Sequence, residues 1–128
     1  MDDAPLDVDV LVVDDDYDIR DTMQEVLAEH GLRVAAVPDG HQALAWLRAN
    51  APPRMILLDL MMPNCDGATF RAEQLAEPDL RHIPVVLVTA DRHPDAIGKK
   101  LAVDGWLTKP VDLATLLATV RRHCSPRP

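Results

Sequence analysis

The sequence predicts an α/β fold in which one parallel sheet is covered by helices on both faces. Short aliphatic runs alternate with segments whose apolar residues recur at helical spacing. The runs are almost continuously apolar, as strands buried on both faces must be. A chain of 128 residues, 48% hydrophobic and 27% charged, has the size and composition of one globular domain. We therefore expect a single domain over residues 1–128, with its core at about 6–124.

The first half of the chain carries two strand and helix pairs. Residues 8–13 and 32–37 are aliphatic runs and predict strands. Gly31 is a natural end for the first helix, and residues 38–40 (Pro-Asp-Gly) have the chemistry of a turn before the second. The residues expected to face inward are Ile19, Met23, Val26 and Leu27 in the first helix and Ala43, Leu44 and Leu47 in the second.

Three further strands are expected, in residues 55–58, 84–88 and 106–108. The third helix follows Asp66-Gly67, and a weak fourth helix is expected in residues 95–102. Asp112 is a suitable N-cap for the last helix, whose expected inward residues are Leu113, Leu116, Leu117 and Val120.

Composition excludes several functional classes. The net charge of −8 argues against a nucleic-acid partner, since phosphate binding needs clustered Lys and Arg. Cys65 and Cys124 lack metal-ligand spacing and are expected to be free thiols, which suits a reducing cytoplasm. The acidic start of the chain does not resemble a signal peptide, and the longest apolar stretch, residues 55–63, is too short to span a bilayer. We expect a cytoplasmic protein without membrane insertion.

Polar residues close four of the expected strands. Asp14 and Asp15 follow the first strand, Asp59 the third, Thr89 the fourth and Lys109 the fifth. In open α/β sheets the functional site lies at the carboxyl ends of the strands, so these residues are expected to meet. Three neighbouring carboxylates repel one another unless a cation and a lysine offset their charge. This pattern indicates divalent-metal and phosphate chemistry.

The chain resembles the receiver domain of bacterial two-component response regulators. The resemblance covers nearly the whole chain and lies in five segments taken in order: Val12-Val13-Asp14-Asp15-Asp16, Leu57-Leu58-Asp59-Leu60-Met61-Met62-Pro63, Asp66-Gly67, Val88-Thr89-Ala90 and Leu107-Thr108-Lys109-Pro110. It implies that Asp59 accepts a phosphoryl group, that Asp14 and Asp15 hold Mg²⁺, that Thr89 contacts the phosphoryl group and that Lys109 pairs with it. The implied fold is flavodoxin-like (βα)₅, with strand order 2-1-3-4-5.

Further expectations concern the metal shell and its surroundings. Mg²⁺ prefers octahedral oxygen ligands, so we expect Asp14, Asp15 and Asp59 to be joined by a backbone carbonyl, that of Met61. The resemblance also implies a cis bond between Lys109 and Pro110. Trp106 is expected either to be a core residue or, by resemblance, to be a rotamer switch.

The expected function is a phosphorylation-dependent signalling switch. The resemblance implies that a histidine kinase or histidine phosphotransfer protein donates the phosphoryl group to Asp59 and that an effector protein reads the result. Such a chain catalyses its own phosphorylation and dephosphorylation, without an external substrate. A constitutive, degenerate binding module is the alternative. A Mg²⁺-dependent aspartyl-phosphate phosphatase of the haloacid-dehalogenase type is less favoured, because it needs a second Asp where this chain has Met61. Flavin binding is disfavoured by the carboxylates in the loops.

Other polar residues have structural interpretations. Asp16 or Asp18 is expected to cap the first helix, and the five histidines show no ligand spacing. Thr89 and Lys109 are twenty residues apart, a shorter interval than the resemblance leads us to expect. The shortening falls on the fourth helix, which also contains Pro94 and Gly98, so we expect this helix to be short.

Overall fold

A computed structural model describes residues 7–62 and 66–124. It contains a five-stranded parallel sheet in the order β2-β1-β3-β4-β5. The strands are β1 (Val10–Val13), β2 (Val34–Val37), β3 (Met55–Asp59), β4 (Val85–Thr89) and β5 (Gly105–Thr108). The helices are α1 (Tyr17–Glu29), α2 (Gly40–Ala49), α3 (Gly67–Ala76), α4 (Pro94–Leu101) and α5 (Leu113–His123). The predicted fold class and strand order are confirmed.

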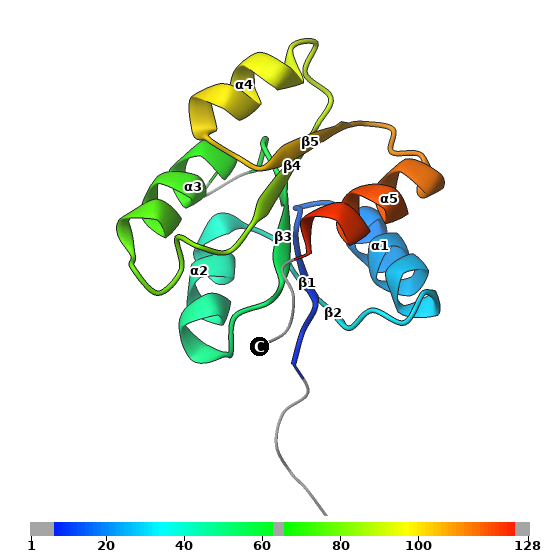
Figure 1. Cartoon of the computed structure of the whole chain (residues 1–128), viewed down its shortest axis with the longest axis horizontal. Coiled ribbons are helices and arrows are strands. Elements are labelled where there is room, and N and C mark those ends of the chain that lie inside the picture. The colour runs from blue at the N-terminus through cyan, green and yellow to red at the C-terminus, as the bar shows by residue number, and fades with distance from the viewer. Residues whose placement is uncertain (1–6, 63–65, 125–128) are drawn as a thin grey trace, which may run out of the picture.

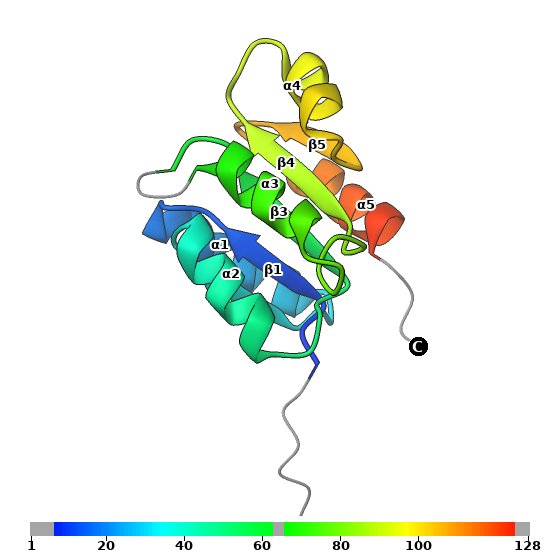
Figure 2. The same cartoon turned by 90° about the vertical axis from the view of Figure 1, so that its left-hand side faces the viewer.

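The sheet separates two apolar layers. Figure 1 views the sheet nearly edge-on, with α1 and α5 on one side and α2 and α3 on the other, and Figure 2 shows α2 and α3 in front of the strands. Side chains that alternate along β1 enter opposite layers, Leu11 and Val13 on the α2 and α3 side, Val10 and Val12 on the α1 and α5 side. The central strands β1, β3 and β4 are buried throughout.

Aspartates begin four of the five helices. The carboxylates of Asp16, Asp39, Asp66 and Asp112 each accept a backbone N–H in the first turn of the helix that follows. For α1 the cap is therefore Asp16, whereas Asp18 lies in the first turn. The exception is α4, whose N-cap residue His93 makes no side-chain capping bond. With eight residues, α4 is also the shortest helix in the described part of the chain, as predicted.

One predicted inward residue is wrong. Leu113 is 48% exposed, because it stands in the first turn of α5 beyond the layer that buries Leu116, Leu117 and Val120. Cys124 is half-buried at the C-cap of α5, and Cys65 lies outside the described residues. Within residues 7–62 and 66–124, no helix combines the length and apolar character needed to cross a bilayer.

Candidate functional site

Strand register brings the predicted site residues to one edge of the sheet. Val13 pairs with Leu58, so the next residues, Asp14 and Asp59, end neighbouring parallel strands. Thr89 ends β4, the strand beside β3. Lys109 follows β5, and its backbone N–H donates to the carbonyl of Thr89 at 2.8 Å. The peptide bond between Lys109 and Pro110 is cis, as predicted.

Three carboxylates form an acidic cluster at this edge. Oxygens of Asp14, Asp15 and Asp59 all lie within 4.8 Å of one another. Asp14 and Asp59 are buried, whereas Asp15 is exposed. Asp14 Oδ1 accepts the N–H of Asp16 at 2.9 Å, and its backbone carbonyl accepts from Arg20 Nη1 at 2.8 Å. The end of β1 is therefore held in place at the start of α1.

Lys109 is shared between the two buried carboxylates. Its Nζ lies 3.3 Å from Asp14 Oδ2 and 3.3 Å from Asp59 Oδ1. Burial alone would lower the pKa of Lys109, but the charges of Asp59 and Asp14 outweigh burial and raise it. The lysine is therefore firmly cationic. One ammonium nevertheless faces three carboxylates, which leaves the cluster short of positive charge.

The surroundings of Asp59 perturb its carboxyl group strongly. Burial, reinforced by the negative charge of Asp14, raises the pKa of Asp59 to about 6, although Lys109 and the backbone of Met61 lower it in part. The ionised form of Asp59 is therefore destabilised relative to an exposed carboxylate, and further positive charge close by would stabilise it. A nucleophilic or metal-binding role fits this environment better than a structural role.

The acidic cluster fits a hard divalent cation. Carboxylate oxygens are the ligands that Mg²⁺ prefers, and the spacing lets Asp14, Asp15 and Asp59 contact one ion directly or through its waters. A divalent charge would counteract the burial and the repulsion from Asp14 that together raise the pKa of Asp59. Met61, whose carbonyl is the predicted fourth protein ligand, is 75% exposed as a residue.

Thr89 is buried and points its hydroxyl toward the loop that leads to α4. Its Oγ1 accepts the N–H of Asp91 at 3.1 Å, and Asp91 Oδ1 in turn accepts the N–H of His93 at 2.8 Å. The threonine is thus the first member of a hydrogen-bonded path from the sheet edge to the N-cap of α4. Trp106, on β5, is 38% exposed and is not a core residue.

In the motif Asp66-Gly67, steric contact explains why the second residue is glycine. Gly67 begins α3, and a Cβ built there would lie 2.8 Å from the carbonyl oxygen of Asp59. The Gly67 N–H donates to the carbonyl of Leu60 at 3.0 Å. Glycine therefore permits α3 to approach the backbone that carries Asp59, which any larger residue would push away.

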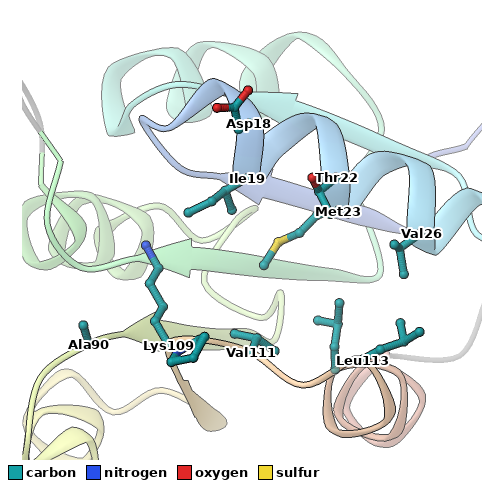
Figure 3. Close-up of a pocket in the computed structure, with 11 residues that line it drawn as sticks. Asp18, Ile19, Thr22, Met23, Val26, Ala90, Lys109, Val111 and Leu113 are labelled. Carbon is teal, nitrogen blue, oxygen red and sulfur yellow. The ribbon is translucent and has the colours of Figure 1, made fainter.

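A groove that the sequence did not reveal opens beside the site. It has a volume of about 660 Å³ and runs between α1 and α5. Figure 3 shows Ile19 and Met23 of α1 opposite Val111 and Leu113, with the Lys109 side chain at one end. The exposed Leu113 belongs to this groove. An apolar residue in the first turn of α5 was the only sequence signal, and helical periodicity assigned it to the core.

Comparison with known proteins gives one consistent family. The family model described as response regulator receiver domain matches residues 10–121. Response regulator PleD of Caulobacter vibrioides is 43% identical over 115 residues, which cover 88% of this chain and 25% of PleD. Two-component response regulator ORR12 of Oryza sativa subsp. japonica is 36% identical over 109 residues, 84% of this chain and 90% of ORR12. The chain thus spans about a quarter of PleD and nearly all of ORR12.

Solved structures agree with these relatives. The chemotaxis protein CheY4 of Vibrio cholerae superposes with a TM-score of 0.83 at 30% identity, covering 92% of this chain and 99% of CheY4. The receiver domain of the sensor histidine kinase PA1611 of Pseudomonas aeruginosa has a TM-score of 0.83 at 26% identity, covering 93% and 98%. That structure has a magnesium ion coordinated in its active-site cleft.

Proposed function

The chain belongs to the response regulator receiver domain family, and from this premise we propose that it is a phosphorylation-controlled switch with Asp59 as the phosphoacceptor. The observation that carries the proposal is the environment of Asp59. This carboxyl group is buried at a strand end within 4.8 Å of two further carboxylates and 3.3 Å from Lys109. Neither a capping role nor a structural ion pair requires this arrangement. Residues 1–128 are proposed to act as one receiver unit with its core at about 6–124.

The proposed reaction moves a phosphoryl group from nitrogen to oxygen. A carboxylate oxygen of Asp59 attacks phosphorus, the bond to a histidine nitrogen of the partner breaks, and the released imidazole nitrogen takes up a proton. The product is an acyl phosphate, which water later cleaves to phosphate and the free carboxylate. Phosphoryl transfer depends mainly on positioning and charge neutralisation. A bound Mg²⁺ would supply positive charge at the phosphoryl oxygens.

Each neighbouring residue has a proposed role. Asp14, Asp15 and Asp59, with the carbonyl of Met61, would hold Mg²⁺. Lys109 would exchange its contact with Asp59 for an ion pair with the new phosphoryl group, for which its compact charge is suited. The Thr89 hydroxyl, already an acceptor from Asp91, retains its own hydrogen to donate to a phosphoryl oxygen.

A small acyl phosphate donor tests the phosphoacceptor directly. With Mg²⁺ present, the wild-type chain should gain one phosphoryl group by intact mass, which hydroxylamine should remove. Asp59→Asn should slow this gain at least a hundredfold. Asp16→Asn is the matched control, since Asn caps a helix as well as Asp does and Asp16 lies beside the acidic cluster without joining it. If Asp59→Asn gains the label at the wild-type rate, the assignment is wrong and the constitutive-module alternative gains support.

The groove between α1 and α5 is the proposed docking site of the histidine-bearing partner. It is apolar, and it ends at Lys109, whose Nζ lies 3.3 Å from Asp59. The exposed acidic residues Asp18, Asp21 and Glu25 lie on α1. The occupant is therefore proposed to be a partner helix with an apolar stripe and basic flanks, as in other helix-in-groove complexes.

Two phosphoryl donors, a protein domain and a small acyl phosphate, distinguish an effect on partner docking from an effect on the transfer reaction. Leu113→Glu places a charge in the lining of the groove, at an exposed residue that does not belong to the acidic cluster. It should slow phosphorylation by a phosphorylated histidine phosphotransfer domain at least tenfold, while phosphorylation by the small acyl phosphate should stay within twofold of wild type. Equal losses with both donors would show that Leu113 supports the fold and not docking.

The readout is proposed to occur on the face formed by α4, β5 and α5, through contacts with an effector protein. Trp106 is exposed on this face, and the hydrogen-bonded path from Thr89 reaches the start of α4. No direct nucleic-acid contact by this chain is proposed, in keeping with its net charge of −8.

A further inference from the structure

Gly98 lies in α4 and faces the indole of Trp106. A Cβ built on Gly98 would lie 2.5 Å from Trp106 Cε3 and 3.0 Å from Cζ3. These distances are shorter than carbon atoms tolerate, so the ring occupies the volume that any side chain at position 98 would fill. Gly98 is buried, whereas Trp106 remains 38% exposed. The indole therefore lies against the backbone of α4, partly covered by it.

The two ends of α4 are held differently. At its C-terminal end the buried Arg71 donates from Nε to the carbonyl of Leu101 at 3.1 Å and from Nη2 to that of Ala102 at 2.6 Å. Arg71 lies on α3, so these two bonds tie this end of α4 to α3, and its donation to Gln74 Oε1 at 2.8 Å holds the guanidinium in place. The N-terminal end lacks a side-chain cap on its own amides. The path from Thr89 through Asp91 reaches this end at His93.

We propose that Gly98 is a positioning residue that seats the Trp106 indole, so that the indole and α4 change position together. With Arg71 holding the C-terminal end, the helix would pivot there and carry Gly98 with it as the end that Thr89 reaches moves. The steric contact alone supports the claim that Gly98 positions the indole, and this claim does not depend on phosphorylation. Its use as a switch rests on the function proposed for Asp59 and Thr89, because a phosphoryl group that draws in Thr89 would then move the helix on which the indole lies.

Helix propensity and the contact with the Trp106 ring predict opposite effects of Gly98→Ala on the stability of the chain. Alanine in a helix interior is favoured over glycine by an amount that makes the unfolding equilibrium constant about fivefold smaller. The contact with Trp106 opposes this gain, since the ring or the helix must shift by a few tenths of an ångström or more. The effect of Gly98→Ala should therefore depend on the residue at position 106.

A double-mutant cycle tests the seat. Gly98→Ala should stabilise the chain about fivefold in a Trp106→Ala background but should give no gain, or a loss, when Trp106 is present. Ala96→Gly is the matched control, because Ala96 is exposed on the same helix, and its cost should be the same in both backgrounds. Equal gains from Gly98→Ala in the two backgrounds would overturn the proposal.

Fluorescence tests the coupling to the switch, with Trp46→Phe in every variant so that Trp106 is the only indole. Beryllofluoride with Mg²⁺ serves as the phosphoryl mimic. In the Trp46→Phe chain that keeps Gly98, we expect the mimic to change the Trp106 emission. In the chain that also carries Gly98→Ala the change should be at least threefold smaller, because the alanine has already displaced the ring from the backbone of α4. An emission change in Gly98→Ala as large as that in the chain with Gly98 would overturn the proposal that the indole and α4 move together. If the Gly98 chain itself gives no change, the proposed switch function fails, while the stability cycle still decides whether the seat exists.

Discussion

Buried aspartates lie at both ends of the sheet, and their partners differ. At the amino end, Asp9 Oδ2 accepts the N–H of Arg33 at 2.8 Å and Oδ1 lies 3.4 Å from Arg54 Nη1. The exposed Asp104 at the same end likewise accepts the N–H of Val85 at 2.8 Å. At the carboxyl end, Asp14 and Asp59 share one lysine. The same residue type is therefore matched by backbone and arginine donors at one end and crowded with other carboxylates at the other.

This contrast separates a carboxylate with structural partners from the carboxylate that is the proposed phosphoacceptor. Asp9 joins the starts of three strands, because its backbone carbonyl also accepts the N–H groups of Arg54 and Met55 at the start of β3. Asp59 has no comparable structural task, and its pKa is raised to about 6 chiefly by burial. We therefore expect Asp9 to stabilise the fold and the ionised Asp59 to destabilise it when no metal is bound. Three substitutions test this comparison, from the largest expected effect to the smallest.

Removing the amino-end carboxylate should destabilise the fold strongly. Asp9→Ala leaves the Arg33 N–H and the Arg54 guanidinium without their carboxylate, and the expected loss is about 3 kcal/mol of unfolding free energy. Urea denaturation at pH 7 measures it. Phosphorylation by a small acyl phosphate, measured under conditions where the variant is folded, should stay near the wild-type rate. A loss below about 1 kcal/mol would mean that Asp9 is not a structural anchor.

Removing the carboxyl-end charge should have the opposite sign. Without metal at pH 7, Asp59→Asn should stabilise the chain by about 2 kcal/mol, because it removes a buried charge whose pKa lies well above the unfolded value of about 3.9. The folded state holds the Asp59 proton more tightly than the unfolded state does. The stability from this group is therefore fully present below pH of about 4 and is lost as the pH rises through about 6.

The pH dependence gives a sharper test than the value at one pH. The stability difference between Asp59→Asn and wild type should be close to zero near pH 4, rise through the window between the two pKa values and level off above pH 7. Asp66→Asn is a useful control, since Asp66 is an exposed helix cap that Asn replaces well. A difference that does not vary between pH 4 and 7 would refute the raised pKa.

The sequence predicted the carboxyl edge better than the amino edge, for a physical reason. Parallel strands all present their carboxyl ends at one edge, so the residues after each apolar run could be placed together without coordinates. Asp14, Asp59, Thr89 and Lys109 were found in this way, and the structure brings them together. Asp9 precedes its strand, and its partners Arg33 and Arg54 are recognisable only once the register of β2 and β3 is known.

Contacts between distant segments explain what the sequence could not supply. Arginine is mostly exposed in proteins, yet Arg71 is buried and donates to carbonyls thirty and thirty-one residues further along the chain. Gly98 reads as a poor helix residue, and its steric role appears only when Trp106 is placed beside it. Leu113 has the correct helical phase for burial but lies where the groove opens. In each case a tertiary neighbour decides the role.

The smallest expected effect concerns Asp15, the exposed member of the acidic cluster. If Asp15 is a metal ligand, Mg²⁺ at ten times its dissociation constant should stabilise the wild-type chain by about 1 kcal/mol through mass action. Asp15→Asn removes one charge from the cluster, so the variant should be at least as stable as wild type without metal. It should also gain less stability from the same Mg²⁺ concentration, because a ligand is lost. Thermal unfolding with and without Mg²⁺ measures both effects, with Asp16→Asn as the neighbouring control. Equal Mg²⁺-induced shifts in wild type and Asp15→Asn would remove Asp15 from the metal site and leave Asp14 and Asp59 as its carboxylate ligands.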